Sequence, residues 1–294
     1  MHVILGAAGK AGRSAIRVLR AANVPVRAVL RDPAKAEAFV AAGCEVAIAD
    51  VSDGRALAQA LSGARAVQVI CPVDARLPDV GRAMNATVET IAEALRASEV
   101  QSVVAISDYG AQHDRGTGVT LVFHHLEACL RDLRAKVTFL RSAEHMQNWA
   151  RLVGVAASTG ILPSMHHPLS KRFPTVSAMD VGAAAAELLR DPQPDAAPRI
   201  VHIEGPQRYS VLDLAAILGR HLGRDVRAEE LPQQQWIPTL MRAGLSESYA
   251  MLVADVFGAH NAGRIDAEAG AGDIRYGSTG FDAVAASLVE GSRR

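Results

Sequence analysis

Apolar and polar positions alternate along the first half of the chain in two recurring patterns. Short apolar runs, typical of strands that are buried on both faces, occur at residues 2–5, 24–30, 44–49, 64–70, 100–106 and 136–141. Between them, apolar residues recur at helical spacing over residues 13–20, 34–42, 54–61, 78–97 and 124–134. Strands and helices that alternate in this way form a doubly wound parallel sheet with right-handed crossovers. We therefore predict an α/β fold of the Rossmann type.

This rhythm changes after residue 150. Pro163, Pro168 and Pro174 interrupt the pattern, and residues 191–198 are typical of a short connector. A strand is predicted at 199–204, and helices are predicted at 178–190, 210–222, 236–244 and 247–260. We predict an NAD(P)-binding domain over residues 1–150 and a smaller α/β substrate lobe over 151–294. The lobe is not expected to fold independently, and its segments can interleave with the first domain.

A glycine-rich turn joins the first predicted strand to the first predicted helix. Three glycines with two residues between neighbours follow the apolar run 2–5 directly. The start of a helix offers free N–H groups and a partial positive charge, and glycine lets the backbone approach a pyrophosphate closely. The first strand of a dinucleotide-binding fold lies at this place in the chain. We predict a phosphate-binding turn made by Gly6, Gly9, Lys10, Ala11 and Gly12.

The end of the second predicted strand distinguishes NADPH from NADH. An acidic residue there accepts a hydrogen bond from the ribose 2′-hydroxyl, whereas an arginine suits a 2′-phosphate. Arg31 comes first after the strand, and Lys10 and Lys35 add positive charge, although Asp32 would repel a phosphate if it pointed inward. The alternative is that Arg31 is a solvated loop residue. We favour the phosphate interpretation and predict NADP(H) as the cofactor.

The ends of the next three predicted strands supply further candidate cofactor contacts. Asp50 leaves the third strand, where a carboxylate can accept from the exocyclic amine of adenine, with Val51 as its apolar neighbour. The alternative role is a helix N-cap, which Ser52 or Asp53 serves as well. Ligands in open α/β sheets lie outside the carboxyl ends of the strands. The fourth and fifth strands accordingly add Cys71, Pro72 and Ser107.

Composition narrows the class of protein. Lys+Arg and Asp+Glu balance at 31 each, aromatic residues make up 4%, and no apolar run approaches the ~20 residues of a membrane span. We therefore expect neither nucleic acid nor membrane as a partner, and we expect no secretory signal at the N-terminus. The scattered cysteines Cys44, Cys71 and Cys129 form no C-x-x-C pair, which favours a reducing cytoplasm over a disulfide framework or a zinc site.

Several short motifs follow the glycine turn in a definite order. They are Val-Leu-Arg-Asp-Pro at 29–33, Thr-Phe-Leu-Arg at 138–141, His-Met-Gln-Asn at 145–148, Val-Ser-Ala-Met-Asp-Val at 176–181 and Ile-Glu-Gly-Pro at 203–206. Together they resemble the NmrA-like branch of the atypical short-chain dehydrogenase/reductase superfamily, almost from end to end. That branch contains NADPH-dependent quinone reductases and dinucleotide-sensing regulators.

The resemblance implies roles for individual residues. It assigns the pyrophosphate to the glycine turn, the 2′-phosphate to Arg31, and the middle of the cofactor to Cys71 and Pro72. It also implies that Asn148 lies near the nicotinamide and the substrate. Adenine is assigned to Asp50 and Val51. The sequence departs from the family at His145, where an aromatic residue is usual.

The helix after the fifth strand lacks the usual catalytic pair of the wider superfamily. That pair is Tyr-x-x-x-Lys, whereas residues 102–135 contain Tyr109 as their only tyrosine and no lysine. The helix instead carries His124 and His125, which point about 100° apart. Either histidine can donate a proton to an oxygen that receives hydride. We favour the alternative that each is hydrogen-bonded structurally, to Glu127 or to Ser107.

Two further clusters of polar residues have structural explanations. Glu127 and Arg141 are predicted to form a buried pair that holds the helix to the next strand. His166, His167 and His202 do not have the spacing of a zinc site, so we predict no metal.

Two classes of function remain open. The first is an NADPH-dependent reductase of quinones or similar conjugated carbonyls, which need little acid catalysis because hydride adds to an electron-poor ring. The second is a non-catalytic NADP(H) sensor, which would tolerate the missing pair. We place the reductase first, acting on a small molecule as a monomer or a homodimer.

Overall fold

The core of the protein is one large parallel sheet. The computed structural model describes residues 1–192 and 198–292, so part of the predicted connector 191–198 lies outside the described residues. Eight strands pair in the order β12-β10-β6-β5-β4-β1-β2-β3, and every pairing is parallel. The strands are β1 (His2–Ile4), β2 (Val26–Leu30), β3 (Glu45–Ile48), β4 (Ala66–Val69), β5 (Ser102–Asp108), β6 (Lys136–Ser142), β10 (Arg199–Glu204) and β12 (Asp273–Tyr276). The predicted doubly wound sheet is confirmed.

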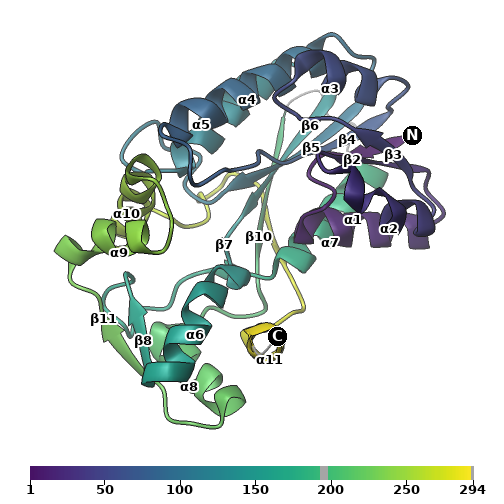
Figure 1. Ribbon diagram of the computed structural model, residues 1–294. Helices are drawn as coiled ribbons and strands as arrows, with labels where there is room; N and C mark the ends of the chain where they lie inside the picture. The colour runs from purple at the N-terminus through teal and green to yellow at the C-terminus, as the bar shows by residue number, and fades with distance from the viewer. Residues whose placement is uncertain (193–197, 293–294) are drawn as a thin grey trace.

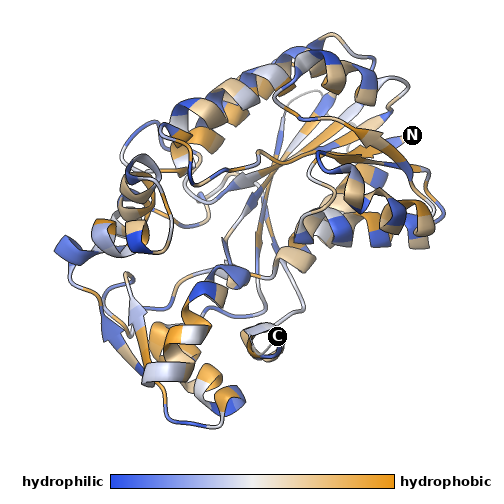
Figure 2. Ribbon diagram, in the orientation of Figure 1, coloured by the Kyte–Doolittle hydropathy of each residue, from blue (hydrophilic) through white to orange (hydrophobic). Residues whose placement is uncertain are grey.

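Helices cover both faces of this sheet (Figure 1). One face carries α1 (Lys10–Ala21), α2 (Ala36–Ala41) and α7 (Ala178–Arg190), and the other carries α3 (Gly54–Leu61), α4 (Val80–Arg96) and α5 (Thr120–Leu130). Successive residues of a strand enter opposite cores, since Val103 packs with the α3–α5 side and Val104 packs with the α1–α7 side. The strands are therefore apolar on both faces, and the centre of the sheet is coloured hydrophobic in Figure 2.

A smaller lobe stands beside the carboxyl edge of the sheet. Its core includes Trp149, Leu162, Leu214 and Phe281, all buried. The lobe contains α6 (Ala150–Thr159), β8 (Ile161–Ser164), α8 (Val211–Leu222), β11 (Arg227–Glu230), α9 (Trp236–Arg242), α10 (Glu247–Asn261) and α11 (Phe281–Ser292). Three 3-10 turns, η1 (Pro33–Lys35), η2 (Met146–Trp149) and η3 (Gln233–Gln235), and the short pair β7 (Glu144–His145) and β9 (Thr175–Val176) complete the described elements.

Segments beyond residue 150 contribute to both parts of the molecule. α7 packs on α1, and β10 and β12 extend the large sheet beyond β6. The residues after 150 therefore contribute to the large sheet as well as to the small lobe. No described helix has the length and apolar character needed to cross a bilayer.

Candidate functional site

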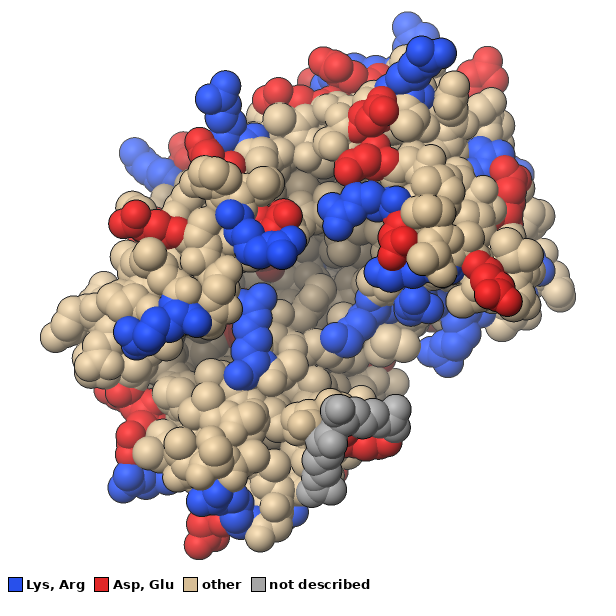
Figure 3. Space-filling model, in the orientation of Figure 1, with Lys and Arg blue, Asp and Glu red and all other residues tan. Residues whose placement is uncertain are grey.

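A crevice separates the large sheet from the small lobe. The face in Figure 3 is hollowed at its centre, and charged side chains flank the hollow. In the same orientation β7, which directly follows β6, lies beside this hollow (Figure 1). Because all strands of the sheet are parallel, the segments that follow β1 to β6 meet along this one edge.

The turn after β1 has a geometry that requires glycine. Gly6 has φ +66°, and a Cβ added there would lie 2.3 Å from Cγ2 of Ile70. A Cβ on Gly12 would lie 2.4 Å from the carbonyl oxygen of Gly6. Gly9 is the N-cap of α1 and supplies no side-chain cap to the first turn. A tight turn of bare backbone before uncapped N–H groups fits a pyrophosphate.

Basic side chains surround the end of β2. Arg31 and Lys35 are exposed there, and the carboxylate of Asp32 accepts from the N–H of Ala34 at 3.0 Å, where it caps η1. Asp32 is thus bonded to its own turn, with Lys35 Nζ at 3.8 Å from its second oxygen. Arg31 therefore stays the predicted contact for a 2′-phosphate.

Arg13 is a basic residue near this end of the crevice that sequence reasoning missed. It lies in the first turn of α1, where its Nε donates to the carbonyl of Ala8 at 3.1 Å. Its guanidinium carbon lies 4.9 Å from the centre of the Phe39 ring. Together with Lys35 it lines a cavity of about 480 Å³ between α1 and α2. In the sequence, its position directly after Gly12 could have marked Arg13 as a candidate.

The residues after β3 are anchored by local hydrogen bonds. Asp50 Oδ1 accepts from the N–H of Ser52 at 3.0 Å and from its hydroxyl at 2.7 Å. These bonds hold the pKa of Asp50 below its usual value, and the charge of Arg31 acts in the same direction. Asp53, not Asp50, caps α3. Val51 is buried beside Asp50.

The side chains at the ends of β4 and β5 differ in their access to a ligand. Cys71 is buried in the core on the α3–α5 side, where its Sγ lies 3.8 Å from the carbonyl oxygen of Met84, and burial raises the pKa of its thiol to about 12; the adjacent Pro72 is exposed. Ser107 is 1% exposed and donates its hydroxyl to Glu127 at 2.6 Å. Contrary to its selection as a cofactor contact, the Ser107 hydroxyl is directed into the core.

The two histidines of α5 are held by protein groups. His124 Nδ1 lies 2.9 Å from the carbonyl oxygen of Ala111, and His125 Nε2 lies 3.2 Å from Oε1 of Glu89 in α4. These partners are not the expected Glu127 and Ser107. Glu127 instead accepts from Arg141 at 2.7 and 2.8 Å, which confirms the predicted buried pair. A catalytic role for His124 or His125 stays a prediction that these contacts do not support.

Asp108 is the second residue that sequence reasoning missed as a candidate. It is the last residue of β5, one position beyond Ser107, and its side chain is partly buried. Burial raises the pKa of its carboxyl to about 8, and the nearby Glu144 carboxylate adds to the shift, while the N–H of Tyr109 opposes it. Asp108 therefore carries a proton at neutral pH. Only its burial distinguishes it from other acids, and the sequence does not reveal that burial.

Glu144 and His145 of β7 lie at the same edge and differ from Asp108 in protonation. Burial alone would raise the pKa of Glu144, but His166, with Nε2 at 2.9 Å, outweighs it and holds that pKa below the usual value. Burial lowers the pKa of His145 to about 4, and Lys10 acts in the same direction, while Glu144 opposes them. The crevice thus brings a protonated carboxyl, a carboxylate and a neutral imidazole to one edge.

Asn148 lies in η2 with an exposed side chain. Its neighbour Gln147 accepts from the N–H of Ala178 at 2.9 Å and donates to the Ser177 hydroxyl at 3.2 Å. These two bonds fix η2 against the start of α7, so the position of Asn148 is set by its neighbour.

The fold and this edge are those of a dinucleotide-binding α/β protein. The NmrA-like family matches residues 2–273, and the chain belongs to that family. Two curated relatives are the NAD(P)H azoreductase of Xenophilus azovorans and quinone oxidoreductase 2 of Escherichia coli strain K12. Both are 26% identical to this chain, and both alignments cover 87% of this chain and 86% of the relative. The crystal structure of the Escherichia coli NADPH-dependent quinone oxidoreductase with NADPH has a TM-score of 0.80 at 22% identity, covering 98% of this chain and 99% of that one.

Proposed function

We propose that the protein is an NADPH-dependent reductase of quinones or similar conjugated acceptors. The observation that carries the proposal is the turn of Gly6, Gly9 and Gly12 at the start of α1, beside the basic end of β2. Two of the relatives that align over most of the chain are named as an NAD(P)H azoreductase and a quinone oxidoreductase. The named activities of these relatives and the predicted NADPH-binding turn therefore support the same kind of reaction.

Each group of residues has a task in this proposal. The first-turn N–H groups of α1 bind the pyrophosphate, and Arg31, with Arg13 and Lys35 near it, binds the 2′-phosphate. NADPH, when bound, supplies the hydride. Asp108 holds the proton that an oxygen or nitrogen of the acceptor requires after the hydride arrives.

A non-catalytic NADP(H) sensor is the second candidate. The observation that favours it is that α5 offers no free catalytic group. His124 and His125 are hydrogen-bonded to Ala111 and Glu89, and no Tyr-x-x-x-Lys pair is present. A sensor needs the cradle and no proton donor. Asp108 is the feature that places the reductase ahead.

The proposal also covers the roles of the two parts of the molecule and the cell compartment. We propose that the large sheet binds the cofactor while the lobe shapes the acceptor site, with α7, β10 and β12 from beyond residue 150 belonging to the sheet side. The three cysteines Cys44, Cys71 and Cys129 are free. They support a cytoplasmic protein, because that compartment keeps thiols reduced.

One assay separates the two functions. Purified protein is mixed with NADPH and a panel of quinones and azo dyes, and the loss of reduced-nicotinamide absorbance is followed. A reductase consumes NADPH only when an acceptor is present. Tight binding of both NADP⁺ and NADPH without consumption for any acceptor would instead establish the sensor.

A further inference from the structure

The four tyrosines of the chain lie in different environments. Tyr109 is 0% exposed, and the hydroxyl of Tyr209 accepts from the N–H of Phe281 at 2.9 Å. Tyr276 is 66% exposed on β12, the strand at one end of the sheet. Tyr249 in α10 is partly exposed, and it packs against the core on the α3–α5 side. It is therefore the tyrosine that combines a packed ring with an accessible side chain.

Hydrogen bonds hold α10 against the segments that follow β4 and β5. The N–H of Val80, at the start of α4, donates to the hydroxyl of Ser248 at 3.3 Å. The N–H of Val119, the residue before α5, donates to the carbonyl of Leu252 at 3.2 Å. Because α4 follows β4 and α5 follows β5, both contacts lie toward the carboxyl edge of the sheet. The amino-terminal half of α10 is therefore fixed beside the crevice (Figure 1).

The far end of α10 reaches the residues that follow β6. The ring centres of His260 and His166 are 5.1 Å apart, and Nε2 of His166 lies 2.9 Å from Oε2 of Glu144. Glu144 comes two residues after β6, the strand beside the one that Asp108 ends. Tyr249 and His260 share one face of α10, since the spacing between them is close to three whole turns. The Tyr249 face is therefore directed toward the ends of β5 and β6.

Charged neighbours on both sides act on the Tyr249 phenol. Burial raises the pKa of this phenol, the guanidinium of Arg151 in α6 opposes the rise, and the charge of the ionised Asp108 carboxyl adds to it. Tyr249 therefore keeps its proton at neutral pH, and Asp108, with a pKa of about 8, keeps its own. The phenol and the carboxyl are two O–H donors within electrostatic reach of each other.

The protein leaves both donors available. The Tyr249 hydroxyl has no hydrogen-bond partner among residues 1–192 and 198–292, and it is not one of the enclosed unpartnered atoms, which include the Tyr109 hydroxyl. The Asp108 carboxyl accepts from the N–H of Tyr109, which uses a lone pair and leaves its proton free. A ligand in the crevice can therefore accept from Tyr249 and Asp108 together.

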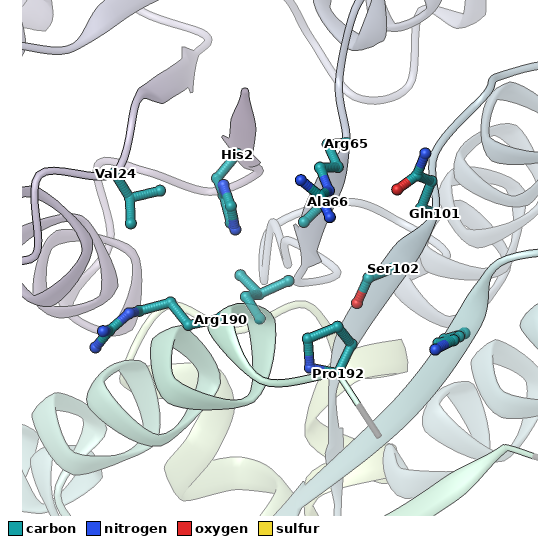
Figure 4. A pocket seen from close by; sticks show the side chains of 10 residues that line it. His2, Val24, Arg65, Ala66, Gln101, Ser102, Arg190 and Pro192 are labelled. Atoms are coloured by element: carbon teal, nitrogen blue, oxygen red, sulfur yellow. The ribbon is translucent and has the colours of Figure 1, made fainter. Parts of the chain in front are cut away.

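The cavity at the amino edge of the sheet is not the place of this ligand. It has a volume of about 320 Å³, and its wall includes His2, Ala66 and Ser102, the first residues of β1, β4 and β5 (Figure 4). Asp108 is the last residue of β5, so the whole strand separates it from this cavity. The acceptor therefore belongs at the carboxyl edge.

Two O–H donors suit a carbonyl oxygen better than an azo nitrogen. A carbonyl oxygen has two lone pairs and accepts two hydrogen bonds, whereas each azo nitrogen has one lone pair. Reduction of a quinone takes up one hydride from NADPH and one proton, and it yields a hydroquinone and NADP⁺. Asp108 gives the proton and regains one from water, while Tyr249 keeps its proton and donates a hydrogen bond. That bond strengthens as negative charge develops on the oxygen.

We propose that Tyr249 is a catalytic residue whose hydroxyl binds the same carbonyl oxygen as the Asp108 carboxyl, so that the protein reduces quinones in preference to azo compounds. The lobe thereby supplies the tyrosine that α5 lacks. This inference rests on the proposed reductase function and specifies its class of acceptor.

Kinetics with two acceptors test the inference. Wild type and Tyr249→Phe are compared at saturating NADPH with 1,4-naphthoquinone and with the azo dye methyl red. We expect Tyr249→Phe to lower kcat/KM for naphthoquinone by about 10- to 100-fold, the range for a lost hydrogen bond to a charged group, with most of the loss in kcat. For methyl red we expect a loss of no more than about threefold, because one donor satisfies one lone pair. Reduction of naphthoquinone alone by the wild type would support the same carbonyl preference.

Tyr276→Phe is the matched control, because β12 is separated from β6 by β10 and the Tyr276 side chain is exposed. It should keep the wild-type kinetics with both acceptors. Phenylalanine preserves the packed ring at position 249, so Tyr249→Phe should also keep the thermal transition and the NADPH affinity of the wild type.

Two kinds of failure are distinguishable. Equal kcat/KM of wild type and Tyr249→Phe for naphthoquinone, or equal losses for both acceptors, would overturn this inference and leave the reductase function standing. Reduction of neither acceptor by the wild type would overturn the proposed function and this inference with it.

Discussion

Asp108 differs in protonation from the other acidic residues that border the crevice. Its pKa of about 8 keeps it protonated at neutral pH, whereas the pKa of Asp50 lies below its ordinary value. We predict that turnover falls as pH rises through about 8, because Asp108 then loses its proton. Asp108→Asn should lower kcat by about 10²-fold at neutral pH and remove this alkaline decline. The measurement is kcat as a function of pH.

Asp114→Asn is the control for this substitution, since Asp114 is an exposed acid in the loop that follows β5. It should keep both the rate and the pH profile of the wild type. Wild-type turnover in Asp108→Asn, with the same alkaline decline, would show that another group supplies the proton.

We propose that Arg31 determines the choice between NADPH and NADH. Arg31→Ala should weaken NADPH binding by about 10- to 100-fold, the range for lost bonds to a charged group, and leave NADH binding nearly unchanged. The two dissociation constants are obtained by fluorescence titration of the reduced nicotinamide. Equal losses for NADPH and NADH would remove the 2′-phosphate from Arg31.

For single residues, the sequence predicts which residues follow a strand end better than it predicts how their side chains are buried and hydrogen-bonded. The need for glycine at Gly6 and Gly12 could be predicted because it depends on residue type and on place after a strand, and Arg31 was selected on the same grounds. Asp108 was not found, because its pKa depends on burial and on Glu144, which is distant in sequence. Ser107 was selected by place alone, and its hydroxyl instead bonds to Glu127.

The contact between α1 and α7 supports the cofactor turn at the scale of whole elements. A Cβ on Gly182 would lie 2.0 Å from the carbonyl oxygen of Ala11, which belongs to the first turn of α1. Gly182→Ala should therefore lower the free energy of unfolding by about 1–3 kcal/mol and weaken NADPH binding as well. Urea denaturation and NADPH titration measure the two effects.

Gly154→Ala provides the comparison within a helix, because no heavy atom lies within 4 Å of an added Cβ in α6. It should be neutral or stabilising by up to about 1 kcal/mol. If Gly182→Ala behaves in the same way, the two helices are not packed as closely as described.

The buried pair of Glu127 and Arg141 joins α5 to β6. Both side chains are 3% exposed. Glu127→Gln removes the carboxylate that faces a buried guanidinium, so it should cost about 3–5 kcal/mol in urea denaturation. Glu89→Gln removes the more exposed partner of His125 and should cost no more than about 1 kcal/mol. Similar costs for the two variants would contradict a structural role specific to the buried pair.

At the element scale, periodicity predicts long amphipathic helices well and short exposed elements poorly. The helices at 54–61 and 178–190 and the strand at 199–204 have the predicted bounds. α5 spans Thr120–Leu130 rather than 124–134, because its mixed polar and apolar residues give no sharp start. The strands β8, β11 and β12 were not predicted, since each has only four residues and little alternation.

For the whole molecule, the sequence predicts the sheet but not how the later segments return to it. Parallel pairing of β10 with β6 and of β12 with β10 depends on contacts between distant residues, such as Ile203 with Ser142. Glu144 and His145 follow β6 directly, and their strand β7 pairs with the distant β9 at the carboxyl edge. The proposed acceptor site therefore depends on contacts between distant segments, whereas the glycine turn after β1 is local.

We propose that the turn at the start of α1 holds NADPH for reduction of a conjugated acceptor. NADPH consumption by wild type and by Gly12→Val, with and without a quinone, tests this proposal. A side chain at position 12 would meet the carbonyl oxygen of Gly6, since even a Cβ there lies 2.4 Å from it. We predict quinone-dependent consumption by the wild type and at least about a 10²-fold loss in the folded variant. No consumption by the wild type, or equal rates for the two proteins, would contradict the claim.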